Sequence, residues 1–331
     1  MRPKRATIYD VAELSGLSHQ TVSRYLRHNG GLKSATAEKV QSAIEALNYR
    51  PNTIARSMRT RRTGRVAILM PAAMHSLPLR LMSAVSATAH LAGYAIDMLG
   101  LEGAEADRVA RAQELADSGE FEGILAIATL GNQPIVSSTT PVVIIADYDD
   151  ELHGTGALAD GAACAEIVKT LVDLGHTHIL HVAGAPQYAS ARNRRRTFVD
   201  TTSKLGVSGI VADGDWLGQS GYDAIAALPA DSVITAVVAA NDTQAMGAIR
   251  AARDRGWRVP EDLSVFGWDD NELCRFTTPS LSTVAIDRER QGRQAMEELV
   301  ALIQGSEPPV PDTTSLHTVV KRESIGPPPR P

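Results

Sequence analysis

The 331-residue sequence has few cysteines and few aromatic residues, and it has no long apolar segment. Its two cysteines, Cys164 and Cys274, stand far apart and outside any CxxC pair, which indicates free thiols in a reducing compartment rather than a disulfide framework. No run approaches the roughly 18 apolar residues that a membrane span needs. The opening MRPKRATIYDVAEL lacks the apolar core of a secretory signal. We therefore expect a cytoplasmic protein.

The usual signatures of catalytic and cofactor sites are also missing. The sequence contains neither GxxxxGK[ST] nor GxSxG, and HGTG at 153–156 lacks the further glycine of a dinucleotide motif. His176, His178 and His181 in GHTHILHVAG look like metal ligands. On a strand, however, positions 178 and 181 point to opposite faces, so these histidines cannot meet at one ion. We expect no cofactor, no metal site and no enzymatic activity.

Positive charge is concentrated at the N-terminal end. Residues 1–65 contain 13 Lys and Arg against four acidic residues, whereas the rest of the chain has 20 basic and 34 acidic residues. The formal net charge of −5 hides this division. A basic segment joined to an acidic body predicts a polyanionic partner at that end only.

The basic segment has the pattern of three short helices. Thr7 to Asp10 has the form of a capping box that begins a first helix, and Gly16 is placed to end it. Ser18 is placed to cap a second helix, and a third begins near Ser34. The residues expected on the inner faces are Val11, Ala12 and Leu14 of the first helix, Val22 and Leu26 of the second, and Val40, Ala43, Ile44 and Leu47 of the third.

This order fits a helix-turn-helix, in which the N-terminal residues of the second helix enter the major groove of DNA. Gln20 and Arg24 lie four residues apart on one face, and they can pair bidentately with adenine and guanine respectively. His19 precedes them, and the hydroxyls of Thr21 and Ser23 suit phosphate contacts. A plain three-helix bundle with a polar face is the alternative.

Two segments resemble a known family. TIYDVAELSGLSHQTVSRYL, followed by EALNYRPNTIARSMR, is similar to the DNA-binding headpiece of the lactose/galactose repressor (LacI/GalR) family of bacterial transcription regulators, and the similarity extends to about Lys321. The resemblance implies a helix-turn-helix domain at 1–49 and a hinge helix with linker at 50–64. In that family two hinge helices pair over DNA and insert an apolar side chain, here Met58, into the minor groove. A simple basic linker is the alternative.

The DNA contacts expected from these patterns and from the resemblance share the headpiece and the hinge. They are Thr7, Tyr9, Ser18, His19, Gln20, Thr21, Ser23, Arg24, Asn29, Asn52, Ala55, Met58 and Arg59.

From Arg65 onward, short apolar runs alternate with helical segments. The predicted strands are VAILM, AIDML, GILAIA, PVVIIA, HILHVA, AVVAA and LSVFG, and the predicted helices include 107–118, 160–174, 190–205 and 242–255. Such alternation predicts parallel sheets covered by helices on both faces. The fold class expected is a small all-α headpiece plus an α/β periplasmic-binding-protein-like core of two doubly wound lobes. The family pattern divides this core, 65–325, into lobes of about 65–158 with 289–312 and 159–288 with 313–325, before a Pro-rich tail at 326–331.

Residues that could bind the effector follow the predicted strands, because parallel sheets bind ligands at the carboxyl ends of their strands. Aromatic rings can stack on a sugar while Asp, Asn and Arg bond its hydroxyls. The family's effector contacts map onto Ser190, Arg194, Trp216, Asn241 and Asp269, and His75 is added from its position alone. Asp242 is as suited to capping a helix as to binding a ligand.

Other positions depart from the sugar-binding members of the family. The sequence has Leu101-Glu102-Gly103 where an arginine is expected, Thr243 where a long amide is expected, and Arg288 where an aromatic residue is expected. The effector therefore differs from that of the best-known relative. A mono- or oligosaccharide is expected, and a nucleoside or another non-sugar molecule is the alternative.

The sequence thus predicts a homodimeric repressor that binds pseudo-palindromic operator DNA under the control of a small molecule. The tail has no leucine heptads, which favours a dimer over a tetramer. Whether the effector releases or tightens DNA binding stays open. The other protein classes considered are a solute-binding protein and a cleft hydrolase that uses Asp242 and Asp269.

Overall fold

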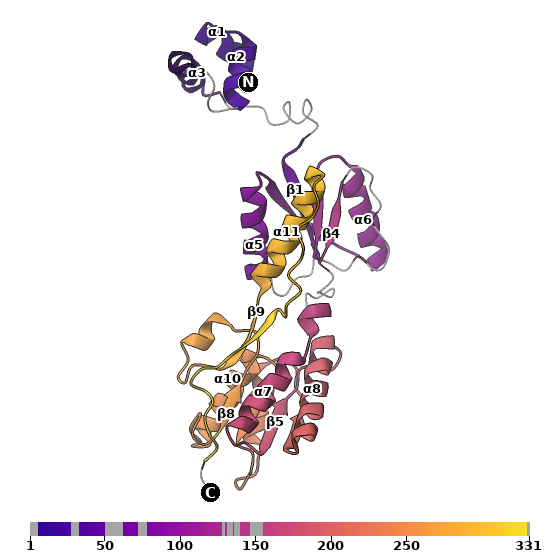
Figure 1. Ribbon diagram of the computed structural model, residues 1–331, viewed down its shortest axis with the longest axis vertical. Coiled ribbons are helices and arrows are strands. Elements are labelled where there is room, and N and C mark those ends of the chain that lie inside the picture. Colours follow the sequence, from indigo (N-terminus) through magenta and orange to yellow (C-terminus); the bar gives the residue numbers. More distant parts are fainter. Residues whose placement is uncertain are drawn as a thin grey trace. The chain divides into compact units, whose positions relative to one another are not determined.

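The computed structural model forms two compact units, Met1–Gly64 and Arg65–Pro331 (Figure 1). It describes residues 6–27, 33–49, 62–71, 78–127, 130, 135, 140–145 and 155–329. Within these ranges, no helix combines the length and the apolar character needed to span a bilayer.

The first unit contains the three expected helices, α1 (Ile8–Ser15), α2 (His19–Arg27) and α3 (Ser34–Ala46). The Thr7 hydroxyl accepts a hydrogen bond from the backbone of Asp10, whose carboxylate in turn accepts from Thr7, so the predicted capping box is confirmed. Gly16 ends α1 in the left-handed conformation, with φ of 65°. The sequence therefore determines where α1 begins and ends.

The core of this unit lies where the three helices meet. Val11, Val22 and Val40 are fully buried, with Ala12 and Ala43 beside them. One expectation is wrong, because Leu14 is 55 % exposed. Successive helical residues advance by about 100°, which carries position 14 beyond the face that contains Val11 and Ala12.

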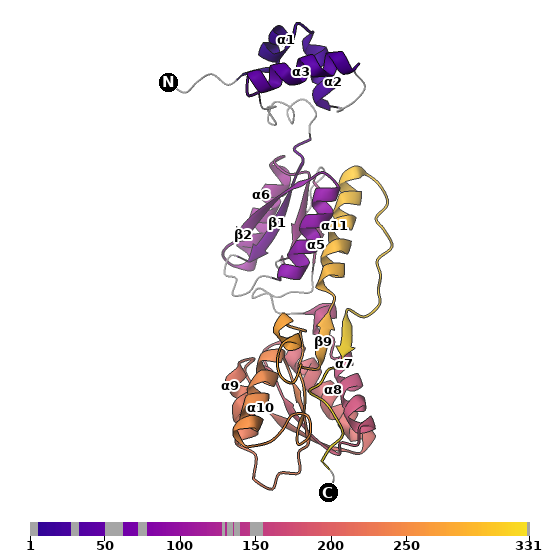
Figure 2. The same cartoon turned by 90° about the vertical axis from the view of Figure 1, so that its left-hand side faces the viewer.

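The first lobe of the second unit is a parallel sheet in the order β2-β1-β3-β4. Its strands are β1 (Arg65–Pro71), β2 (Ala95–Leu101), β3 (Gly123–Ala126) and β4 (Val142–Ile144), and its helices are α5 (Leu79–Leu91), α6 (Glu105–Asp117) and α11 (Arg288–Gln304). Alternate residues of β1 face opposite sides, so Val66 and Ile68 pack toward α5 and α11, whereas Ala67 and Leu69 pack toward α6. Figure 2 shows α11 beside α5, although they are distant in the sequence.

The second lobe repeats this plan with a parallel sheet in the order β6-β5-β7-β8. Its elements are α7 (Ala162–Asp173), β5 (His178–Val182), α8 (Ala189–Leu205), β6 (Ser208–Ala212), α9 (Gly218–Ala226), β7 (Ala236–Ala239), α10 (Asp242–Asp254) and β8 (Ser264–Phe266), with 3-10 turns at Gly156–Ala159 and Glu272–Arg275. Its central strands β5 and β7 are buried on both faces, as parallel sheets require, whereas the edge strand β6 is largely exposed.

A two-stranded antiparallel ribbon joins the lobes. β9 (Thr283–Ile286) leads into α11 of the first lobe, and β10 (His317–Val320) pairs with β9 on the way back. Residues 322–326 then bond to the second lobe, where Ser324 is fully buried. The last part of the chain is therefore built into both lobes.

Candidate functional sites

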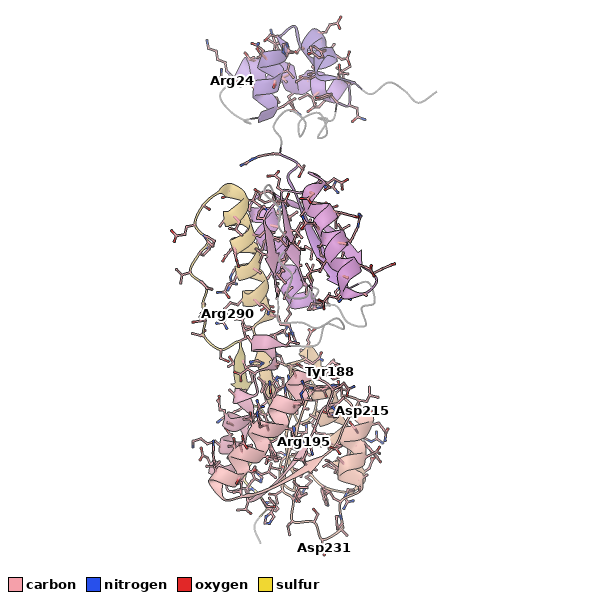
Figure 3. All side chains as sticks on the ribbon, turned by 90° about the vertical axis from the view of Figure 1, so that its right-hand side faces the viewer. Arg24, Tyr188, Arg195, Asp215, Asp231 and Arg290 are labelled. Atoms are coloured by element: carbon pink, nitrogen blue, oxygen red, sulfur yellow. The ribbon has the colours of Figure 1, made fainter. Side chains whose placement is uncertain are left out.

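The exposed face of α2 carries the predicted base-reading residues. His19, Gln20 and Arg24 are all exposed, and Figure 3 shows Arg24 extending away from the other helices of its unit. Ser18 fixes the start of the helix, because its Oγ accepts a hydrogen bond from the Thr21 backbone at 3.2 Å. The helix therefore presents an ordered polar N-terminus.

A second exposed residue lies beside this N-terminus. The Tyr9 ring is 5.5 Å from the His19 imidazole, between ring centres, and Tyr9 is 66 % exposed. On the other side of α2, the Tyr25 hydroxyl donates to Gln41 of α3 at 2.9 Å. The contact of Tyr9 with His19 adds α1 to the candidate DNA-binding surface.

The structure corrects one expected phosphate contact. Ser23 follows the buried Val22 on α2 and is itself only 8 % exposed, so little of it is open to a phosphate. Thr21 is half-buried, and its hydroxyl lies 2.9 Å from the Ser18 hydroxyl. Of the remaining predicted contacts, Thr7 is exposed at the start of α1. Asn29, Asn52, Ala55, Met58 and Arg59 lie outside the described residues.

Arg194 is at the centre of the candidate effector site. It comes from α8 and is 5 % exposed. Its guanidinium stacks 4.1 Å from the Trp268 ring centre and 5.7 Å from that of Trp216, and Nη1 donates to the Ala240 carbonyl at 2.5 Å. Burial lowers the pKa of Arg194 to about 10, so the group stays charged at neutral pH. A fixed positive charge therefore lies near the carboxyl ends of β7 and β8.

Trp216 is held in place by its backbone and by a glycine. Its φ is 73°, a left-handed conformation, and its ring lies against Gly184, where a Cβ would meet the ring at 2.4 Å. Asn241 donates from Nδ2 to the Trp216 carbonyl at 2.9 Å and accepts from the Gln244 backbone at 2.8 Å. Asn241 therefore caps α10 and positions Trp216 at the same time.

The adjacent acids Asp269 and Asp270 have different surroundings. The Asp269 carboxylate lies 3.8 Å from Arg288, and burial raises its pKa while Arg194 and Arg288 lower it. Asp270 is 4 % exposed and pairs with Arg322 at 2.5 Å and with Arg275 at 3.5 Å. Both acids have positive φ, 109° and 48°. Asp269 is thus the acid of this pair that faces the candidate site, and Asp270 holds the turn.

The Asp242 carboxylate is used in hydrogen bonds within the protein. Asp242 is the first residue of α10, after the cap Asn241, so the expected capping role belongs to Asn241. Its carboxylate accepts from the Thr283 hydroxyl at 2.5 Å and from the Asn271 backbone at 2.8 Å. Burial raises the pKa of Asp242 to about 6. The carboxylate therefore ties the turn after β8 to β9.

The other predicted effector residues are less informative. Ser190 is 5 % exposed in the first turn of α8, the helix that carries Arg194. His75 lies outside the described residues. Sequence reasoning did not select Arg80, whose Nη2 donates to the Asp270 carbonyl at 3.3 Å, across the two lobes. The one feature of the sequence that could have indicated Arg80 is its place at the start of the first helix after β1.

The three histidines of GHTHILHVAG have separate surroundings. His176 bonds to the Thr235 hydroxyl at 2.8 Å and to the Gly326 carbonyl at 2.9 Å. His181 is fully buried and stacks on Phe198, with ring centres 5.1 Å apart. His178 lies half-buried, with its Nδ1 3.0 Å from the hydroxyl of Thr177. The first of them therefore joins the segment before β7 to the C-terminal segment.

His181 should make stability depend on pH. Burial lowers its pKa to about 4, so between pH 6.5 and 4 the unfolded chain binds a proton that the folded chain does not. The free energy of unfolding should therefore fall as pH falls, by about 2 kcal/mol from this residue at pH 5. Asp242 acts in the opposite direction over pH 4–6, so His181→Asn must be compared with wild type by denaturant titration at pH 7 and 5. An identical loss on acidification in both proteins would contradict the assignment.

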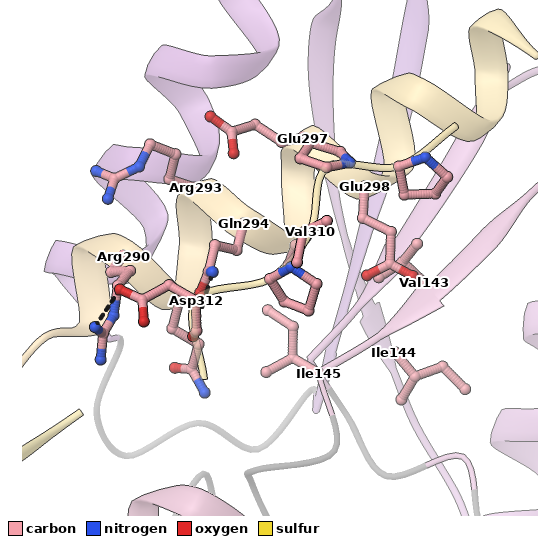
Figure 4. Close-up of a pocket in the computed structure, with 15 residues that line it drawn as sticks. Val143, Ile144, Ile145, Arg290, Arg293, Gln294, Glu297, Glu298, Val310 and Asp312 are labelled. Atoms are coloured by element: carbon pink, nitrogen blue, oxygen red, sulfur yellow. Dashed lines mark hydrogen bonds and ion pairs between the residues drawn. The ribbon is translucent and has the colours of Figure 1, made fainter. Parts of the chain in front are cut away.

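A groove of about 510 Å³ lies elsewhere, on the first lobe. It is lined by β4, α11 and residues 308–312 (Figure 4). Arg290 pairs with Asp312 at 2.8 Å and holds that segment against α11. The groove shares no residue with the predicted effector set, and we place the candidate site at Arg194 because the buried charge is there.

Two family models match the chain. Residues 7–52 match the model for bacterial regulatory proteins of the lacI family, and residues 168–325 match that for a periplasmic binding protein-like domain. The ribose operon repressor of Escherichia coli (strain K12) is 30 % identical over 308 residues, which cover 89 % of this chain and 92 % of that protein. The chain belongs to the lacI family.

Further relatives agree with this assignment. The lactose operon repressor of Escherichia coli (strain K12) is 31 % identical over 317 residues, 91 % of this chain and 86 % of that protein. The crystal structure of the Lac repressor bound to ONPG in the repressed state has a TM-score of 0.69 at 26 % identity, and it covers 97 % of this chain and 100 % of that chain. This lacI-family protein is a transcriptional repressor with an effector-binding domain, and it is not an enzyme. The predicted family and fold class are confirmed.

Proposed function

We propose that this repressor is a cytoplasmic homodimer on a pseudo-palindromic operator, and that a sugar-like small molecule controls its binding. The observation that carries the proposal is Arg194, a buried charge stacked on Trp268 and near Trp216 and Asp269. Stacked rings beside hydrogen-bonding charges suit a ring with polar substituents. Relatives named for ribose and lactose support a sugar, and a nucleoside is the second candidate.

The proposed effector contacts have distinct roles. Arg194 and Asp269 bond the ligand directly, and Trp216 packs against its ring. Asn241 acts through Trp216, whose carbonyl it bonds at 2.9 Å. Ser190 stays a proposed contact on the family pattern alone, and His75 stays one on its position after the first strand alone.

The proposed control works through the arrangement of the two lobes. Arg80 from the first lobe already bonds the turn of the second lobe at Asp270. A ligand beside that turn would favour one lobe arrangement, and the hinge helices would pair in only one of them. The shift is limited by the difference in ligand affinity between the two arrangements, and its sign can be release or tightening.

The proposed DNA contacts have different roles. His19, Gln20 and Arg24 read bases, because they are exposed at the start of a capped helix. Thr21 contacts phosphates, Arg59 contacts phosphates or a groove, and Met58 enters the minor groove, while Ala55 lets the paired hinge helices approach closely. Thr7, Tyr9, Ser18, Asn29 and Asn52 stay proposed DNA contacts without an assigned role. Ser23 is left out because it is buried.

Exchange of Gln20 should change specificity. The exposed amide makes a base contact, so Gln20→Ala should relax the preference at one position of each half-site and cost about 1–3 kcal/mol against the original operator. Thr21→Ala should weaken all operators by similar factors, because its contact is to phosphate. Selection from random-sequence DNA followed by affinity measurement distinguishes the two variants. Uniform weakening by both would show that α2 does not read sequence.

A further inference from the structure

His317 lies where the chain passes between the two lobes. The chain runs from the first lobe to the second before α7, returns to the first lobe after β9 and leaves it again before β10. His317 begins β10 and pairs with Ile286 at the end of β9. Its imidazole donates to the carbonyl of Leu158, in the 3-10 turn before α7. His317 therefore connects each of these passages.

The same imidazole reaches the proposed effector site. It lies edge-on to Trp268, with the ring centres 5.6 Å apart and the ring planes inclined by 63°. The indole also stacks with the guanidinium of Arg194, which lies 4.1 Å from its centre. Because Trp268 is only 1 % exposed, close packing should transmit a displacement of His317 to the indole and to the charge stacked on it.

Two nitrogen atoms of these neighbouring rings have no hydrogen-bond partner among the described residues. They are Nε2 of His317 and Nε1 of Trp268. Nε1 of an indole can only donate. Burial and the charge of Arg194 lower the pKa of His317 to about 4, so the imidazole is neutral at pH 7.

The two unpaired atoms are complementary. Because Nε2 has no partner, the bond of His317 to the Leu158 carbonyl comes from Nδ1, which therefore carries the proton. Nε2 then has a free lone pair and can only accept. Buried polar groups are rarely left unsatisfied, so a state in which Nε1 of Trp268 donates to this lone pair is expected.

We propose that His317 is a positioning residue, which couples Trp268 and Arg194 to the connections between the lobes. In one lobe arrangement Nε1 of Trp268 donates to Nε2 of His317, and in the other this bond is broken. A ligand that displaces Arg194 moves the indole and so changes the balance between the arrangements. This inference rests on the proposed control by an effector and names the contact that transmits it.

The test observes Trp268 and needs no identified effector. If lobe arrangement and operator binding are coupled, operator DNA must shift the same balance. Full-length protein with isotope-labelled tryptophan has three indole N–H signals in nuclear magnetic resonance spectra, and Trp216→Phe and Trp257→Phe assign them. Saturation with the operator that the wild type selects from random-sequence DNA should shift the Trp268 signal. The Trp257 signal, from a ring that packs against Arg255, should stay in place.

Variants show whether His317 is responsible. His317→Phe keeps a ring against Trp268 but no acceptor, so its Trp268 signal should not respond to operator, and its operator Kd without effector should change by about fivefold or more. His317→Gln keeps an acceptor and should restore the response, with an operator Kd within about twofold of the wild type. His178→Phe, a matched change of a half-buried histidine on β5, should behave as the wild type.

The wild-type spectrum decides first, whatever the stability of the variants, and unfolding curves show which variants are folded. A Trp268 signal that operator leaves in place in the wild type would overturn the inference. So would a signal that still shifts in His317→Phe, or equal operator Kd values in the two proteins. A wild type that selects no operator would contradict the proposed function itself, so the two failures are distinguishable.

Discussion

Asp270→Asn is expected to lower the free energy of unfolding by about 3–5 kcal/mol, because it leaves Arg322 without its carboxylate in a buried place. The two side chains are 5 % and 13 % exposed and lie 2.5 Å apart. Asparagine tolerates the positive φ of this position, so the change in the free energy of unfolding does not include added backbone strain. Denaturant unfolding of the purified chain measures the effect.

An exposed ion pair provides the control. Arg258 and Asp262 lie 2.8 Å apart with side chains 70 % and 28 % exposed, and this pairing lowers the pKa of Asp262 to about 2. Solvent screens such pairs, so Asp262→Asn should cost about 1 kcal/mol or less. Equal losses in the two variants would contradict the structural role of Asp270.

Arg194→Met should abolish most of the effector response and leave operator binding in place. Methionine keeps an apolar chain against Trp268 but removes the charge and its donors, which should weaken effector binding about a hundredfold. Calorimetry with the effector and anisotropy with labelled operator measure the two properties separately.

The neighbouring Arg195 is the matched control. It follows on the same helix, but its side chain is 47 % exposed and pairs with Asp213 at 2.6 Å, itself 84 % exposed. Arg195→Met should change neither effector nor operator binding beyond about twofold. Similar losses in both arginine variants would remove Arg194 from the proposed site.

Much of the fold could be predicted because local and tertiary preferences agree. The buried strands β1, β5 and β7 are apolar runs between helices, and α1 has both its cap and its terminating glycine. β6 was missed because it is an edge strand of half-exposed residues that begins with Ser208 and Gly209. β9 and β10 were missed because their pairing joins segments about thirty residues apart, which no local pattern shows.

The candidate site was only partly predictable for a related reason. The positions of Arg194, Trp216 and Asp269 follow from motifs at strand ends, and the structure places Arg194 near both others. The family pattern selects Asp269 over Asp270, but no local feature of the sequence explains the difference, because it depends on the pairing of Asp270 with Arg322, more than fifty residues away. Likewise the burial of Ser23 depends on how α2 packs in its unit.

Control of DNA binding by the effector requires that the two proposed sites be energetically coupled, and this coupling can be measured. Full-length protein and its selected operator are titrated by anisotropy with and without a saturating effector, found by calorimetric screening of sugars and nucleosides. The effector should change the operator Kd by about 5–150-fold, and operator DNA must change the effector Kd by the same factor. An effector that binds at Arg194 yet leaves the operator Kd unchanged would contradict this coupling.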